Sequence, residues 1–233
     1  SRLVFGCGAA LMFRRKDALL SAAYDAGINV FDVGYRGYYR NAEKNLAPFI
    51  RKVRDRVFLI SKARADLEAE PDQRITVQQA RQAAESWGQK LDASLWELQV
   101  DHLDAYYLMA SHNPSLIESE EVYRTFQEAR QSGKVAHLGL STHRNAEKVL
   151  LAAVKTGWYD LAMIAITPGG WYDWEKKSIL EGSKPMIGLQ PVLEKAREAG
   201  IGLVGMKAAR HLAGLPILGW FKKTEAFDEY YDE

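Results

Sequence analysis

Two charged residues end two short apolar runs and could act together in catalysis. Asp32 ends the run over residues 29–32, and Lys62 ends the run over residues 58–62. Apolar runs of this length between helical patterns are typical of strands buried on both faces of a parallel sheet. If these strands are parallel neighbours, a carboxylate and an ammonium lie side by side at the sheet edge where α/β enzymes place their sites. Because charges are costly to bury, the pair indicates either an active site or a structural ion pair.

Further apolar runs separated by helical patterns would position these two residues. We expect strands over residues 3–8, 28–33, 57–63, 103–109, 135–140, 161–166 and 202–206. Three-four spacing of apolar residues predicts helices between them, over about 16–26, 42–53, 76–98, around Phe126 and Leu150, and over 191–199. Residues 167–188 form the longest irregular stretch, and its Trp171, Tyr172 and Trp174 indicate a lid, a substrate wall or a subunit contact.

The order helix, small residue, glycine, strand occurs four times, at Gly27, Gly133, Gly157 and Gly200. Short glycine-capped turns between helices and buried strands are typical of a βα repeat. We therefore expect one α/β domain over residues 1–233, a (β/α)8 TIM barrel whose eighth βα unit is not evident. Residues 213–233 are expected to be a tail or a peripheral helix, and an open parallel sheet is the alternative architecture.

Composition and charge indicate which kinds of binding partner the chain is expected to have. With 47% hydrophobic residues and a net charge of +1, the chain can bury a large core and gives no support for a nucleic-acid partner. The single Cys7 excludes an intrachain disulfide and fits a reducing, cytoplasmic location. No apolar run approaches the roughly 20 residues that span a bilayer. We expect no metal and no membrane partner, and a homo-oligomer stays open.

Five segments, taken together, resemble the aldo-keto reductases. They are residues 25–32 (DAGINVFD), 58–62 (FLISK), 100–108 (VDHLDAYYL), 133–142 (GKVAHLGLST) and 200–207 (GIGLVGMK). The resemblance implies a TIM barrel and an oxidoreductase that transfers a hydride from NADPH to a small aldehyde or ketone. It also implies a catalytic tetrad of Asp, Tyr, Lys and His.

Two members of that tetrad correspond residue by residue to this sequence. Asp32 takes the carboxylate role and Lys62 the ammonium role. The tyrosine position of the family is Gly37 here, and Tyr38 and Tyr39 follow it; spacing favours Tyr38, and Tyr39 is the alternative. A phenol has an ordinary pKa of about 10, and a nearby ammonium is expected to lower it so that the phenol can protonate the carbonyl oxygen.

The histidine position of the family is occupied by Met109. His112 lies three residues further on, and it either folds back into the site or belongs to a surface loop. If Met109 replaces the histidine, reduction is expected to be slow, because a positioned acid or base contributes about 10²–10⁴-fold.

The resemblance assigns NADP(H) to a set of residues at strand ends: Gly6, Ser141, Thr142, Met163, Met206 and Lys207. Ser141 and Thr142 stand where the family has a Ser-Asn pair on the nicotinamide carboxamide, and Met163 where many members have glutamine. Met206 and Lys207 would lie near the pyrophosphate. Gly6, together with Gly8, would allow close approach of the backbone to the cofactor.

Two other functions remain open from the residues. Gly37 and Met109 favour a catalytically weak or inactive barrel that binds NADP(H) as a sensor or regulatory module. The third alternative is an isomerase or lyase that uses Asp32 and Lys62 without a nicotinamide.

Overall fold

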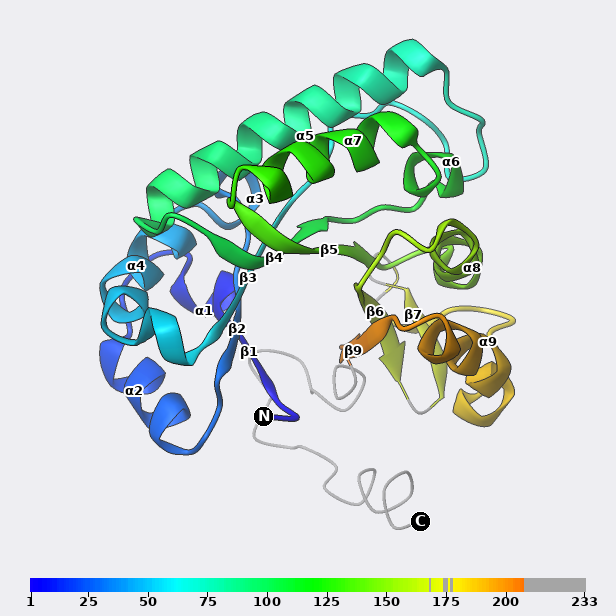
Figure 1. Cartoon of the computed structure of the whole chain (residues 1–233). Helices are drawn as coiled ribbons and strands as arrows, with labels where there is room; N and C mark the ends of the chain where they lie inside the picture. Colours follow the sequence, from blue (N-terminus) through cyan, green and yellow to red (C-terminus); the bar gives the residue numbers. More distant parts are fainter. Residues whose placement is uncertain (168, 174–175, 177, 208–233) are drawn as a thin grey trace.

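Seven parallel strands form one curled sheet in the computed structural model, which describes residues 1–167, 169–173, 176 and 178–207 (Figure 1). The order across the sheet follows the chain from β1 to β6, and β9 pairs with the far side of β6. The strands are β1 (Val4–Gly6), β2 (Val30–Asp32), β3 (Phe58–Ala63), β4 (Leu103–Leu108), β5 (Val135–Thr142), β6 (Leu161–Thr167) and β9 (Gly202–Met206). All seven predicted strands are present, but the first is shorter than the predicted 3–8, because Cys7 and Gly8 begin a helix.

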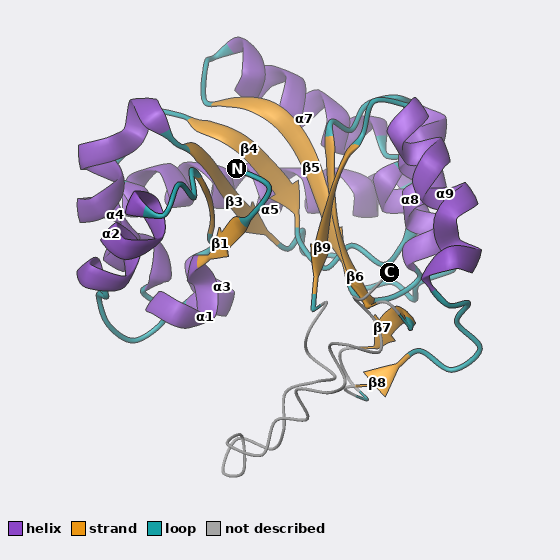
Figure 2. Ribbon diagram, turned by 90° about the horizontal axis from the view of Figure 1, so that it is seen from below, coloured by secondary structure: helices purple, strands orange, loops and turns teal. Residues whose placement is uncertain are grey.

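Helices cover the outer face of the curled sheet (Figures 1 and 2). They are α1 (Cys7–Leu11), α2 (Asp17–Asp25), α3 (Arg36–Tyr39), α4 (Ala42–Val53), η1 (Arg54–Arg56), α5 (Val77–Leu98), α6 (Pro114–Ile117), α7 (Glu120–Gln131), α8 (Ala146–Thr156) and α9 (Met186–Glu198). The predicted helices are confirmed, except that α9 begins before the predicted start and carries Pro191 inside. The short α1, α3 and α6 were not predicted because one helical turn leaves little periodicity to read.

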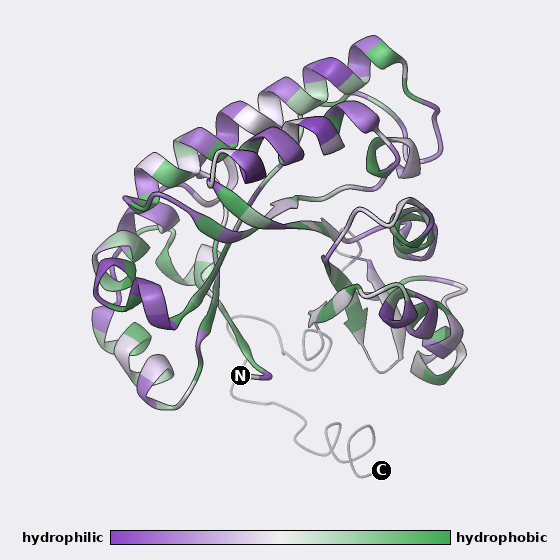
Figure 3. Ribbon diagram, viewed as in Figure 1, coloured by the Kyte–Doolittle hydropathy of each residue, from purple (hydrophilic) through white to green (hydrophobic). Residues whose placement is uncertain are grey.

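Side chains alternate between two cores along the strands. Leu59, Tyr106 and Leu138 point outward and pack under the helices in the main core. Ile60, Tyr107 and Met163 point inward and form a smaller cluster inside the curl. Figure 3 shows many apolar residues along the strands and a mixture of polar and apolar residues along the helices. Polar residues on the inner face are therefore exceptions that point to a site.

Left-handed glycines close four of the helix-to-strand turns. Gly27, Gly133, Gly157 and Gly200 have φ values of 88°, 75°, 65° and 79°. A side chain strains this conformation, so glycine ends each helix and returns the chain to the sheet. The predicted βα repeat is confirmed at all four positions.

The stretch over residues 167–188 is not irregular throughout, which corrects the prediction. β7 (Gly170–Asp173) runs antiparallel to β6 and to β8 (Ser178–Ile179). Gly170, at φ 128°, allows the reversal, and Trp171 is buried in a cluster with Ile164 and Ile166. The free energy gained by burying these apolar side chains outweighs the preference of the local sequence for a loop. Figure 2 shows the hairpin at the same end of the sheet as α1 and α3, where the parallel strands end.

Several expectations fall on residues outside the described ranges. Trp174, the eighth βα unit and the segment 213–233 are among them. Within the described residues, no helix has the length and apolar character needed to cross a bilayer. No group of three or more His, Cys, Asp or Glu side chains there is arranged to hold a metal ion.

Candidate active site

Asp32 and Lys62 meet inside the curl, where neighbouring strands β2 and β3 end. Asp32 pairs in register with Ile60, so Lys62 occupies the next inward position along β3. The Lys62 ammonium donates to both carboxylate oxygens of Asp32 and to the Val33 carbonyl oxygen at 2.8 Å. Both side chains are buried. The expected side-by-side arrangement is confirmed, although it leaves the role of the pair open.

The residue before Lys62 attaches β3 to a helix on the outer face of the sheet. Ser61 points outward and donates a hydrogen bond of 2.6 Å to Glu43 on α4. Burial raises the pKa of the Asp32 carboxyl, and the bonded Lys62 ammonium offsets part of that increase. Asp32 therefore holds the Lys62 ammonium in a fixed position at the mouth of the curled sheet, the side at which the parallel strands end.

Tyr39 is the tyrosine that lies against this pair. The Lys62 nitrogen is 5.8 Å from the centroid of the Tyr39 ring. The ring fits a slot between Gly8 and Gly34, where an added Cβ would come within 2.6 Å and 2.8 Å of ring carbons. Gly8 thus makes room for a side chain, whereas the sequence had suggested that it makes room for a cofactor.

Tyr38 lies one layer further out. Its ring meets the Tyr39 ring edge-on at 4.8 Å, and the Arg64 guanidinium stacks over it at 5.1 Å. Spacing alone had favoured Tyr38. The turn of α3 instead directs the second tyrosine toward Lys62.

Burial raises the pKa of the Tyr39 hydroxyl, and the Asp32 carboxylate adds to the increase. This direction is opposite to the expected one, because burial and the Asp32 charge outweigh the lowering effect of the one cation that acts on the phenol, Arg64. Tyr39 is consequently a neutral phenol that keeps its proton over the physiological range. Such a group can donate a proton only as negative charge develops on a bound oxygen.

A strained residue turns the chain after Met109. Ala110 has φ 52°, a left-handed conformation that costs an alanine energy. Its N–H donates to the Ser141 hydroxyl oxygen at 3.3 Å. The turn brings His112 back toward β5, where its Nδ1 lies 3.1 Å from the Thr142 hydroxyl. The structure thus places His112 in a half-buried position by the mouth and leaves Met109 buried at the end of β4.

His143 joins this group although the sequence had not marked it. It follows Ser141 by two residues, so alternation would have placed it inward. Burial lowers the pKa of His143 to about 4, with further lowering by Lys207, His112, Arg64 and Lys62. Burial and the nearby Arg144 and Arg64 lower the pKa of His112 to about 4. Both imidazoles are therefore neutral at pH 7.

Tyr107 is a second inward residue, and no sequence motif marks it as part of a site. It pairs in register with Lys62, is fully buried, and lies over Gly139. Its hydroxyl has no hydrogen-bond partner among the described residues. Burial raises its pKa, and the Asp32 charge raises it further. Tyr107 therefore closes the floor beneath Lys62 with a phenol that stays neutral.

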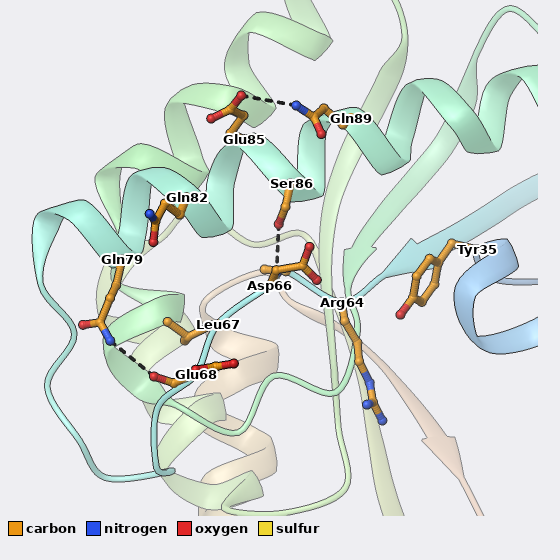
Figure 4. Close-up of a pocket in the computed structure, with 11 residues that line it drawn as sticks. Tyr35, Arg64, Asp66, Leu67, Glu68, Gln79, Gln82, Glu85, Ser86 and Gln89 are labelled. Carbon is orange, nitrogen blue, oxygen red and sulfur yellow. Dashed lines mark hydrogen bonds between the residues drawn. The ribbon is translucent and has the colours of Figure 1, made fainter.

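A polar groove of about 940 Å³ runs outside the mouth, between the segment after β3 and helix α5 (Figure 4). Tyr35 and Arg64 border it on one side, and Gln79, Gln82 and Glu85 on the other. Asp66 is held there by its backbone N–H, which donates to the Ser86 hydroxyl at 2.8 Å. Arg64, two residues after Lys62 in the chain, is thus one of the residues that line this groove.

The sequence profile of the Aldo/keto reductase family matches residues 6–208. The chain belongs to the aldo/keto reductase family. Members of this family fold as (β/α)8 barrels, and the curled sheet of seven strands is part of such a barrel. No curated protein matches the sequence.

Solved structures agree with the aldo/keto reductase fold. A candidate aldo-keto reductase from Pseudomonas aeruginosa is 22% identical over 89% of this chain and 73% of its own, with a TM-score of 0.61. An aldo-keto reductase from Bacillus halodurans, in its holo form, is 19% identical over 93% and 66%, with a TM-score of 0.62. One from Brucella melitensis is 19% identical over 97% and 75%, with a TM-score of 0.59. At these identities the likeness shows the fold alone.

The aldo/keto reductase family generally uses a nicotinamide cofactor, and the inner face offers part of a fit for it. Ser141, Met163 and Met206 lie on neighbouring strands β5, β6 and β9, and both methionines belong to the inner apolar cluster. The Ser141 hydroxyl accepts the Ala110 N–H, and no acceptor for its own proton is found among the described residues. Thr142 is different, because its hydroxyl donates to the Arg144 carbonyl oxygen at 2.5 Å and also contacts His112.

Gly6 and Lys207 complete the predicted cofactor set. Gly6 is the register partner of Asp32, and a Cβ built on it meets no described atom within 4 Å. Lys207 follows β9 directly, with φ 69°, and its charge acts on both Asp32 and His143. Open space by Gly6, a Ser141 hydroxyl whose proton has no acceptor in the described part of the chain, and a cation directly after β9 are compatible with a bound dinucleotide.

Proposed function

We propose that this aldo/keto reductase reduces a small aldehyde or ketone with NADPH as the hydride donor. The observation that supports the proposal is the Lys62 ammonium, held by Asp32 on one side and facing the Tyr39 ring on the other. A phenol beside a fixed ammonium is what protonation of a developing alkoxide needs.

In the proposed mechanism, Tyr39 donates a hydrogen bond to the carbonyl oxygen and then its proton. Lys62 stabilises the phenolate that remains, and Asp32 keeps Lys62 charged and oriented. His143, which is neutral and whose pKa is lowered in part by the Lys62 charge, would donate a second hydrogen bond in place of the histidine that Met109 replaces. When bound, NADPH supplies the hydride.

Residues for holding NADP(H) are proposed by position. Ser141 would donate to the nicotinamide carboxamide, with Met163 and Met206 against the ring. Gly6 would leave room for the backbone approach, and Lys207 would face the pyrophosphate. Thr142, with its hydroxyl committed to the β5 turn, would act on the cofactor only through the position of Ser141. A cytoplasmic location remains part of the same proposal.

One observation favours a second function, a barrel that binds NADP(H) with little or no turnover. Met109 is buried where the family has its histidine, and its backbone N–H donates to the Ala63 carbonyl oxygen at 2.8 Å. In that case cofactor binding would survive without reduction.

Two measurements separate these functions. Titration of cofactor fluorescence tests binding, and oxidation of NADPH with a panel of small aldehydes and ketones tests turnover. We expect Lys62→Met to reduce kcat by about 10²–10⁴-fold while binding persists. Because Lys62→Met leaves a buried Asp32 unpaired, Lys62→Met/Asp32→Asn serves as a variant that removes both charges and keeps the fold. Equal, negligible turnover of wild type and variants would support the sensor, and failure to bind the cofactor would reject both functions.

A further inference from the structure

The segment that carries Tyr39 is attached to β3 at two neighbouring residues. Before Tyr39, the Tyr35 backbone N–H donates to the Lys62 carbonyl oxygen at 2.9 Å. After Tyr39, the Glu43 carboxyl accepts a hydrogen bond of 2.6 Å from the Ser61 hydroxyl. The segment therefore forms a closed loop on the strand end that presents Lys62, with Tyr39 midway between the two attachments.

The second attachment is the one that depends on a side chain. The Tyr35 bond joins two backbone groups and holds the beginning of α3. Helix α3 ends at Tyr39, and Arg40, with φ 50°, turns the chain toward α4. Glu43 lies in the first turn of α4, four residues after Tyr39. Its bond to Ser61 therefore joins the end of the loop to β3.

Glu43 is buried to a degree that is unusual for a carboxyl group. Its exposed fraction is 2%, and the fully buried Ser94 of α5 lies near it. Burial raises the pKa of the Glu43 carboxyl, whereas the Ser61 and Ser94 hydroxyls and the Lys62 charge lower it. Burying a carboxyl costs free energy that burying an apolar side chain of similar size would not. A role for the polar group itself therefore explains this residue better than packing alone.

We propose that Glu43 is a positioning residue, which by binding Ser61 sets the distance between the Tyr39 hydroxyl and the Lys62 ammonium. Ser61 directly precedes Lys62, and Glu43 follows Tyr39 after one short turn. A misplacement of roughly 1 Å between reacting groups can lower a rate about 10²-fold. This inference rests on the proposed reductase function for its effect on catalysis, but the position of Tyr39 can be measured without turnover.

The kinetic test compares variants of this one hydrogen bond. Glu43→Ala and Ser61→Ala each remove one partner, whereas Glu43→Gln keeps a side-chain oxygen that can accept from Ser61. We expect kcat to fall about 10- to 100-fold in both alanine variants and to stay within about threefold of wild type in Glu43→Gln. The dissociation constant for NADPH should be unchanged in all three. The double variant Glu43→Ala/Ser61→Ala should lose no more than the weaker single variant, because both substitutions act on one bond.

Asp104→Ala is the matched control, because Asp104 attaches the beginning of the same strand. Its carboxylate accepts the Leu59 N–H at 2.6 Å and pairs with Arg54 at 2.9 Å. We expect this variant to lower the urea midpoint and to keep kcat within about threefold of wild type. An equal loss of kcat in Asp104→Ala, or a loss in Glu43→Gln as large as that in Glu43→Ala, would overturn the proposal.

The measurement without turnover uses protein labelled with meta-fluorotyrosine. The fluorine NMR resonance of Tyr39 is the one that is absent from Tyr39→Phe. We expect this resonance to keep its wild-type position in Glu43→Gln and Asp104→Ala, and to shift or broaden in Glu43→Ala and Ser61→Ala. An unchanged resonance in both alanine variants would also overturn the proposal.

The fluorine spectrum separates this inference from the proposed function. If wild type reduces no carbonyl compound, the reductase function fails, and the Tyr39 resonance still decides whether Glu43 positions the ring. Circular dichroism verifies that each variant is folded. Should Glu43→Ala not fold, Ser61→Ala alone decides the outcome, because it removes the same bond with the loss of one hydroxyl.

Discussion

At the scale of single residues, the proposed chemistry depends on how one ammonium is held. The Lys62 nitrogen has two fixed acceptors, the Asp32 carboxylate and the Val33 carbonyl oxygen. A lysine side chain in water samples many rotamers, so these contacts remove most of that freedom before a substrate binds. The ring of Tyr39 is held equally closely by the slot between Gly8 and Gly34.

Replacement of the two tyrosines should separate their roles. We expect Tyr39→Phe to lower kcat by about 10²–10⁴-fold, because it removes the proposed proton donor and leaves the ring in its slot. Tyr38→Phe, the matched control, should change kcat less than about threefold, because its ring contacts Arg64 and lies further from Lys62. Steady-state kinetics on both variants decides the assignment, and the reverse order of losses would move the acid to Tyr38.

Some of these residues could be predicted from the sequence and others could not. The pairing of Asp32 with Lys62 could be predicted because each residue ends a short apolar run that is typical of a buried strand. Buried parallel strands end at the same edge of a sheet, so the two charged side chains are expected to meet there. The choice between Tyr38 and Tyr39 depends on Gly8, which is distant in sequence, and on the turn of α3. His143 could have been found from alternation along β5, but no motif marked it.

At the scale of elements, the loops after β4 and β5 carry the neutral histidines. Both have a pKa of about 4 in the folded chain against an ordinary value of 6.5, so the unfolded chain binds more protons between these values. Their contribution to stability is complete above about pH 6.5 and decreases as the pH falls toward 4.

We therefore expect the urea midpoint of wild type to fall between pH 7 and pH 5, and to fall less in His112→Gln/His143→Gln. Urea denaturation at the two pH values measures both changes. The same decrease in wild type and in the double variant would show that other groups cause it.

Helix α1 should influence catalysis through the Tyr39 ring. In Gly8→Ala the new Cβ would lie within 2.6 Å of a ring carbon, so the ring must move. We expect a loss in kcat of about 10- to 100-fold, since a displacement of roughly 1 Å can have that effect. The same substitution in Tyr39→Phe should add little further loss. Additive losses in the double variant would mean that Gly8 acts in another way.

The elements themselves were largely predictable, apart from the hairpin of β7 and β8. Strands and long helices show a clear pattern of apolar residues in the sequence, and a glycine marks the turn from helix to strand at four places. The hairpin forms because Trp171 is buried against Ile164 and Ile166 on β6, a contact that no local pattern shows. The turn at Ala110, which decides where His112 lies, is equally a product of distant partners such as Ser141.

At the scale of the whole molecule, the cofactor residues come from strands at opposite sides of the curled sheet. Gly6 ends β1, whereas Met206 ends β9 and Lys207 follows it. A dinucleotide that contacts both would connect the first described strand to the last. Its binding should therefore stabilise the fold as a unit and not only one loop.

Thermal unfolding with added cofactor tests this expectation. At a concentration of 100 times Kd, binding adds about 2.7 kcal/mol, which for a chain of this size corresponds to a Tm increase of about 5–10 °C. Comparison of NADPH with NADH at equal concentration reports the preferred cofactor. An unchanged Tm with both would argue against a dinucleotide site.

The left-handed alanine at position 110 has a consequence for laboratory evolution. Glycine or asparagine would adopt its φ of 52° with less strain, so a library randomised at this codon and sorted for heat resistance should lose the alanine. Sorting the same library for turnover should retain it if the restricted turn, which places His112 against Thr142, keeps the neighbouring His143 in position. The two enriched pools would then differ at a residue that touches neither reactant.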